Sequence, residues 1–146
     1  MHSIHASSAP QPLAALPLVL PMSESRVHAG FPSPAEDFAV NRLDLTQILI
    51  THPQAPYIWK VAGASMENLG IHDGDLLLVN RALRALHDYI VVATVDGEYT
   101  LKQLHQRPGP LRLKAGNPSF PDIIPKDGQI IEIWGVVTSS IKRFIP

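Results

Sequence analysis

The chain has 146 residues, of which 45% are hydrophobic and 17% are charged, and its formal net charge at pH 7 is −1. This composition is typical of one globular domain with a modest core, and the charge balance excludes a general affinity for nucleic acid or anionic membranes. The chain has no cysteine, which excludes disulfides and thiolate metal sites. We expect no metal and no cofactor, because no metal-ligand spacing connects the seven histidines: His2, His5, His28, His52, His72, His87 and His105.

Residues 1–29 are predicted to be a flexible arm, because they contain four prolines and no sustained periodicity. The apolar run at 12–22 is too short to span a bilayer and is interrupted by proline, and no basic segment of a secretory signal precedes it. We therefore expect a cytoplasmic protein with no membrane association. The apolar content of the arm also allows part of it to pack on the body or to pair as a strand.

Two short helices are predicted after the arm. Ser33-Pro34-Ala35-Glu36 has the pattern of a capping box with proline at the first helical position. Asp44-Leu45-Thr46-Gln47 repeats this capping pattern, and the helix that it begins should run to about Ile50. His52-Pro53 then ends it, because the residue before proline avoids the helical conformation.

The rest of the chain is predicted to be mostly β. Asp96-Gly97 separates two strand-like runs and accepts the positive φ angles of a two-residue hairpin turn. Prolines and glycines punctuate the loops between the runs. We expect six or seven strands, which include residues 57–62, 75–80, 89–95, 98–105, 111–115 and 130–144.

The stretch "VAGASMENLGIHDGDLLLVN" (61–80) places a lone serine, Ser65, at a tight turn. Gly63 permits the turn, and residues 66–69 with Gly70 behind them are predicted to form one helical turn. Free backbone amides near Ser65 could then stabilise an oxyanion, and we assign this support to Gly63, Ala64 and Met66. A serine beside glycine is more commonly a turn or cap residue, so the turn alone does not establish catalysis.

Lys102 lies within the second strand of the predicted hairpin. Alternation places Thr100, Lys102 and Leu104 on one face, but neither face is cleanly apolar, so the pattern does not tell which face is buried. A solvated edge lysine is the common case. If the side chain is instead half buried, its pKa falls and the neutral amine can act as the base for serine. A Ser-His-Asp arrangement with one of the histidines also remains open.

Several stretches resemble the UmuD family, including its plasmid-borne MucA-type members, and the carboxy-terminal domain of the LexA repressor. They are "GFPSPAEDF", "HPQAPYIWKVAGASM", "IHDGDLLLVNRALRALHDYIVVATVDGEYTLKQL" and "IEIWGVV", which occur in order over roughly residues 29–140. The joint occurrence of G-x-S-M, D-G-D and the D-G-E-x-T-x-K hairpin is more specific than any one of them. The resemblance implies a mainly β, LexA carboxy-terminal-domain-like (β-clip) fold.

The resemblance also implies a latent, self-cleaving serine peptidase with a Ser-Lys dyad. The residues that match the family pattern are Ser65 as nucleophile and Lys102 as base, which lie 37 residues apart. The cleaved bond matches Ala29-Gly30, where alanine stands as in LexA rather than the cysteine of many UmuD proteins. Residues 1–29 would then be the arm that is removed, and residues 30–146 the catalytic and dimerisation domain.

The biology implied by the resemblance is the SOS response to DNA damage. A RecA filament on single-stranded DNA stimulates self-cleavage, and the truncated homodimer joins a UmuC-like Y-family polymerase in error-prone translesion synthesis. No sequence-specific DNA binding by the chain itself is expected.

Three alternative functions fit the sequence less well. A LexA-like repressor needs a helix-turn-helix before the cleavage site, and the 29 proline-interrupted residues before Gly30 do not accommodate one. A signal peptidase shares the serine-lysine chemistry but needs a membrane anchor. A binding module that kept the fold and lost the chemistry would not be expected to retain both Ser65 and Lys102.

Overall fold

The computed structural model describes residues 16–32, 40–107 and 109–145. These residues form two compact units, one of residues 16–32 and 40–51 and the other of residues 52–107 and 109–145. Strands make up 40% of the described residues and helices 7%, which confirms the mainly β fold class. No helix among the described residues is long and apolar enough to cross a bilayer.

The smaller unit contains a two-stranded antiparallel sheet of β1 (Val19–Ser23) and β2 (Val40–Asp44), followed by α1 (Leu45–Leu49). Asp44 caps α1 as predicted, since its Oδ1 accepts from the Thr46 amide at 3.0 Å. Strand β1 lies within the predicted arm, so this part of the arm pairs as a strand. The helix expected at Ser33–Glu36 lies outside the described residues.

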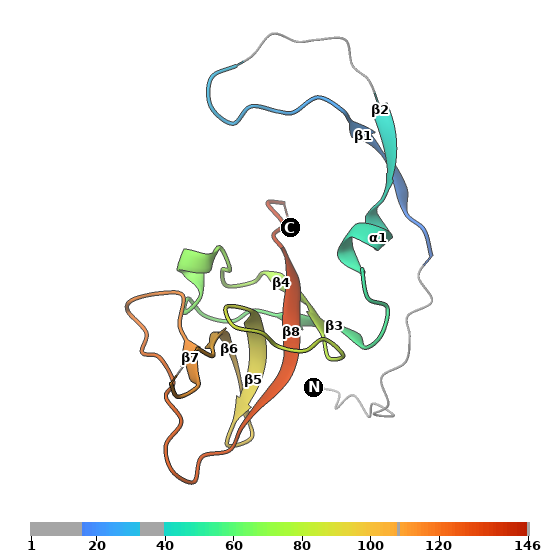
Figure 1. Ribbon diagram of the computed structural model, residues 1–146. Helices are drawn as coiled ribbons and strands as arrows, with labels where there is room; N and C mark the ends of the chain where they lie inside the picture. Colours follow the sequence, from blue (N-terminus) through green and yellow to red (C-terminus); the bar gives the residue numbers. More distant parts are fainter. Residues whose placement is uncertain (1–15, 33–39, 108, 146) are drawn as a thin grey trace. The chain divides into compact units, whose positions relative to one another are not determined.

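The larger unit contains a six-stranded antiparallel sheet with the order β3-β4-β8-β5-β6-β7 (Figure 1). The long strand β8, drawn in red, pairs with β4 on one side and β5 on the other. All six predicted strands are confirmed, with ends that differ by up to three residues. They are β3 (Pro56–Lys60), β4 (Leu76–Asn80), β5 (Ile90–Val95), β6 (Glu98–His105), β7 (Arg112–Lys114) and β8 (Ile131–Ile141).

The β5–β6 hairpin confirms the turn predicted at Asp96-Gly97. Both turn residues have positive φ angles, 50° and 84°, and Val95 pairs with Glu98 across the turn. A two-residue turn fixes the register of the two strands that it joins. This register places Lys102 directly opposite Val91.

Two apolar clusters form the core, and adjacent residues of β5 belong to different clusters. Val92 packs with Leu77 and Val79, whereas Val91 packs with Leu104 and Leu113. Because residues directly opposite in an antiparallel pair lie on the same face, Lys102 shares the face of Val91 and the second cluster. The sequence pattern did not tell which face of β6 is buried. In the structure, the buried face is the one that carries Lys102.

Candidate active site

Ser65 lies in the turn between β3 and the 3₁₀ helix η1 (Glu67–Leu69), which ends at Gly70 as predicted. The turn needs glycine at position 63, where φ is 97°. The Gly63 amide donates to Asp73 Oδ1 at 2.8 Å, which ties the turn to the loop before β4. Ser65 is half buried, so its hydroxyl is held in place and remains accessible.

A second segment, residues 116 and 117, clamps this turn from beyond β7, and we call it the Gly116–Asn117 strap. The Gly116 amide donates to the Ser65 carbonyl at 2.7 Å, and the Asn68 amide donates back to the Gly116 carbonyl at 2.6 Å. The Asn117 side chain donates from Nδ2 to the Ala64 carbonyl at 2.9 Å. Sequence reasoning missed the strap, because Gly-Asn-Pro signals a turn but does not show what the turn touches.

Lys102 is buried, with 8% of its surface exposed, and its Nζ lies 3.3 Å from Ser65 Oγ. The amine also donates to the Leu101 carbonyl at 3.0 Å. Burial lowers the pKa of Lys102 below its ordinary value, since desolvation penalises the charged form, and the carboxylate of Asp122 raises it to a smaller extent. The structure thus brings Ser65 and Lys102 together and raises the share of the neutral amine, which a base requires.

No histidine takes the place of the lysine in the part of the chain that the structure describes, where Lys102 is the only side chain hydrogen-bonded to Ser65 Oγ. A neutral lysine Nζ carries two N–H bonds and one lone pair. One N–H can be held by the Leu101 carbonyl, which leaves the lone pair available to the serine proton. This is the geometry of a serine nucleophile with a lysine base.

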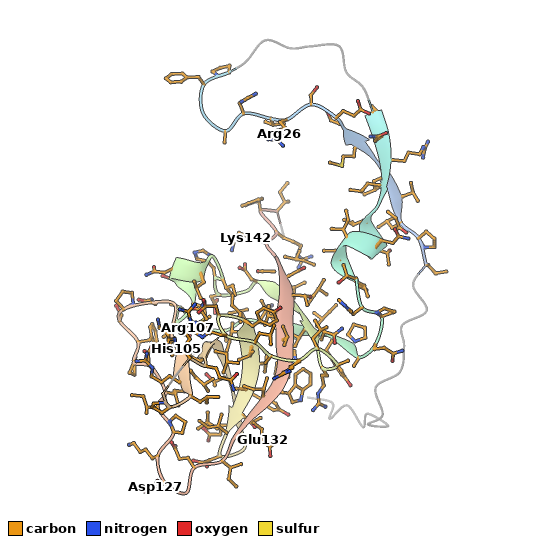
Figure 2. All side chains as sticks on the ribbon, viewed as in Figure 1. Arg26, His105, Arg107, Asp127, Glu132 and Lys142 are labelled. Carbon is orange, nitrogen blue, oxygen red and sulfur yellow. The ribbon has the colours of Figure 1, made fainter. Side chains whose placement is uncertain are left out.

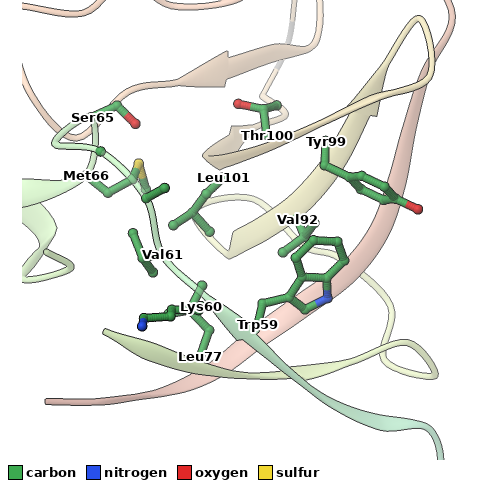
Figure 3. Close-up of a pocket in the computed structure, with 12 residues that line it drawn as sticks. Trp59, Lys60, Val61, Ser65, Met66, Leu77, Val92, Tyr99, Thr100 and Leu101 are labelled. Carbon is green, nitrogen blue, oxygen red and sulfur yellow. The ribbon is translucent and has the colours of Figure 1, made fainter. Parts of the chain in front are cut away.

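A cavity of about 270 Å³ opens beside Ser65 (Figure 3). Ser65 and Met66 lie at one side of it, and Trp59 and Tyr99 form an aromatic wall at the other, with ring centroids 4.9 Å apart. Its floor and sides are mostly apolar, with contributions from Val61, Leu77, Val92 and Leu101. Such a lining fits a short peptide segment with apolar side chains.

The bond expected to be cleaved, Ala29-Gly30, lies in the smaller unit between β1 and β2, and both residues are exposed. Its apolar neighbours Val27 and Phe31 are 96% and 95% exposed. The segment is therefore accessible and has no packing of its own among the described residues of this unit.

A second buried charged group, Asp75, lies away from the dyad. Lys142, directly beyond the end of β8 (Figure 2), places Nζ 2.7 and 2.8 Å from the two carboxylate oxygens. This contact, more than any other, lowers the pKa of Asp75, and the His72 amide lowers it further. The pair ties the turn after Gly74 to the last strand and has no direct contact with Ser65.

His87, Asp88 and His105 place potential metal-ligand atoms within 4.8 Å of one another. His87 Nδ1 accepts from the Gln106 amide at 2.9 Å, so a neutral His87 carries its proton on Nε2. That Nε2 lies 3.2 Å from Asp88 Oδ1. The ring nitrogen that faces the cluster is therefore a donor rather than a metal ligand.

The model of the family described as "Peptidase S24-like" matches residues 21–138. The chain belongs to the S24-like peptidase family. The match includes the turn with Ser65, the strand β6 that carries Lys102, and the segment with Ala29-Gly30.

Curated relatives support this membership and confirm the resemblance to UmuD-type and LexA-type proteins. The chain is 46% identical to Protein MucA of Escherichia coli over 123 residues, which is 84% of each chain. It is 43% identical to Protein ImpA of Shigella flexneri over 126 residues, 86% of this chain and 85% of ImpA. The LexA repressor of Polaromonas naphthalenivorans is 35% identical over 125 residues, 86% of this chain but only 53% of the repressor.

Proposed function

We propose that this protein is a latent serine peptidase that cleaves its own chain between Ala29 and Gly30, with Ser65 as nucleophile and Lys102 as base. The observation that carries the proposal is the 3.3 Å separation of Lys102 Nζ and Ser65 Oγ, at a lysine that is only 8% exposed. Membership of the S24-like family supports it. A buried lysine is costly to retain, and a role as base accounts for its presence at this place.

The reaction follows from these atoms. Lys102 Nζ takes the proton of Ser65 Oγ as the oxygen attacks the carbonyl carbon of Ala29. Backbone amides at the Ser65 turn stabilise the negative charge that develops on the carbonyl oxygen. The Ala29–Gly30 bond then breaks, and the Gly30 nitrogen leaves with the proton from Lys102. Water, deprotonated by the same amine, hydrolyses the ester between Ala29 and Ser65.

Cleavage at this bond separates the two strands of the smaller unit, since β1 leaves with residues 1–29 and β2 stays with residues 30–146. Among the described residues, five residue pairs join β1 to β2, and three further hydrogen bonds join Leu16 and Leu18 to residues 44–46. An isolated two-stranded sheet is marginal in water, so the fragments should come apart after the cut. Removal of the arm thereby changes the surface of the retained chain in one irreversible step.

In the cell, we infer a role in SOS mutagenesis, on the basis of similarity to MucA and ImpA. A RecA filament on single-stranded DNA stimulates the self-cleavage, and the truncated product acts as a homodimer with a UmuC-like Y-family polymerase. In this role the protein works in the cytoplasm and needs no cofactor. Addition of RecA, single-stranded DNA and ATP to the purified chain should raise its cleavage rate, and an unchanged rate would contradict this part of the proposal.

The chemical proposal is tested with the purified full-length chain at mildly alkaline pH. Mass spectrometry should find a fragment that begins at Gly30, and Ser65→Ala and Lys102→Ala should each abolish its formation. Ser119→Ala and Lys126→Ala are matched controls, because both side chains are exposed, and they should cleave at the wild-type rate. A different new terminus, or an unchanged rate in Lys102→Ala, would refute the assignment.

A further inference from the structure

We propose that Asn117 is a positioning residue that, together with Gly116, turns the backbone amides of Ser65 and Met66 toward the developing oxyanion. This inference rests on the proposed self-cleavage and deepens it. It concerns residues 116 and 117 after β7, neither of which is hydrogen-bonded to Ser65 Oγ or Lys102 Nζ among the described residues.

The strap fixes the direction of two consecutive peptide planes in the Ser65 turn. The Ala64 carbonyl accepts from Asn117 Nδ2 at 2.9 Å, and the Ser65 carbonyl accepts from the Gly116 amide at 2.7 Å. Neither peptide bond is cis. In a trans peptide the C=O and N–H bonds point in opposite directions. Both carbonyls are held toward the strap, so the amides of Ser65 and Met66 point away from it.

These two amides have no hydrogen-bond acceptor among the described residues. Within residues 16–32, 40–107 and 109–145, neither the Ser65 nor the Met66 N–H donates a hydrogen bond. Met66 is only 1% exposed, and a buried amide in a folded protein is nearly always paired. Two adjacent unpaired donors, one of them on the nucleophile itself, are what an oxyanion in acyl transfer requires.

The strap itself is held rigidly by its own hydrogen bonds and packing. Asn117 Oδ1 accepts from the Ser119 amide at 3.0 Å, so both ends of the side-chain amide are engaged. Gly116 fits because it has no Cβ, which would lie 2.9 Å from Leu69 Cγ and 3.1 Å from Met66 Cα. The close approach brings the strap within hydrogen-bond distance of the turn. Asn117 is the only side chain that the described residues contribute to this clamp of the two carbonyls.

The test is self-cleavage of the full-length Asn117→Leu variant, which removes the donor without adding charge. We expect the rate to fall about 10- to 100-fold, since loss of one well-aimed oxyanion donor costs on the order of 100-fold or more. The fall should be the same factor at every pH, because Lys102 is untouched. Ser119→Ala keeps the backbone amide that binds Asn117 and should cleave at the wild-type rate.

A rate within twofold of wild type in Asn117→Leu would overturn the inference. So would a loss accompanied by a displaced midpoint of the pH profile, because that result would mean that the variant separates Ser65 from Lys102. If Asn117→Leu does not unfold cooperatively, Asn117→Ala is measured against the same criteria. Failure of the wild-type chain to cleave would instead refute the proposed function, so the two failures are distinguishable.

Discussion

The pH dependence of self-cleavage is the sharpest test of the lysine base. A lysine with the ordinary pKa of about 10.4 is neutral in only about one molecule in 2,500 at pH 7. Lys102 is 8% exposed, and desolvation lowers its pKa from that value. Each unit of lowering raises the neutral fraction at pH 7 about tenfold. The logarithm of the rate should therefore rise by about one per pH unit and level off at a pH below 10.4.

The assay follows the full-length chain on gels from about pH 6.5 to pH 10.5. Lys102→Arg is the matched control, because the guanidinium stays charged throughout this range and cannot accept the serine proton. It should not cleave at any pH. A flat profile, a rate that still rises linearly above pH 10.4, or cleavage by Lys102→Arg would each refute the reasoning.

Burial of Lys102 also lowers the free energy of unfolding at pH values where the amine is charged. The pKa of Lys102 is lower in the folded chain, so the unfolded chain binds more protons between the two pKa values. The loss of stability is complete at pH values below the pKa of Lys102 in the folded chain, and it disappears as the pH rises toward about 10.4. Lys102→Met should thus raise the free energy of unfolding at pH 7, by about 1.4 kcal/mol for each pKa unit, and the gain should shrink at pH 10 in urea titrations. An equal gain at both pH values would contradict a titrating buried amine.

Two further predictions concern parts that support the site. Lys142→Met leaves the carboxylate of Asp75, 5% exposed, without its cation, and should lower the free energy of unfolding by about 1–3 kcal/mol at pH 7, measured in urea. The pKa of Asp75 is lowered in the fold, so this difference should be complete above about pH 4 and decline as the pH falls through that lowered pKa; an equal difference at about pH 2 would be evidence against the pair. Gly116→Ala should reduce stability by about 1–3 kcal/mol and slow cleavage, because its Cβ would meet Leu69 and the Met66 backbone; an unchanged melting temperature would show that the contact relaxes freely.

The parts of the fold that could be predicted from sequence are those set by local chemistry. Asp96-Gly97 takes positive φ angles and fixes the β5–β6 hairpin, and β6 begins and ends at the predicted residues, Glu98 and His105. The Asp44 cap and the glycine stop at Gly70 are likewise found where predicted. Each of these features depends on a few consecutive residues, and tertiary packing did not override them.

Contacts between distant segments could not be predicted in the same way. Lys142 and Asp75 are 67 residues apart, and their pairing depends on β8 ending beside the turn before β4. Asn117 meets Ala64 across 53 residues because of where β7 ends. Alternation in β6 also could not assign the buried face, since the face that carries Lys102 is set by the pairing of Lys102 with Val91, a member of the second cluster on the neighbouring strand. No local pattern encodes such contacts.

The uncut chain already has the dyad in reacting distance, and this bears on how a latent peptidase would be controlled. Lys102 is fixed by its place in a paired strand, and Ser65 by a turn that is hydrogen-bonded to the strap. Ser65 and Lys102 are therefore already assembled in the uncut chain, and their assembly offers little for a regulator to control. Ala29 and Gly30 instead lie in an exposed segment of the other compact unit. If the chain cleaves itself as proposed, the fraction of molecules with that segment bound at Ser65 sets the rate, and a partner that binds this state more tightly accelerates cleavage without altering the dyad.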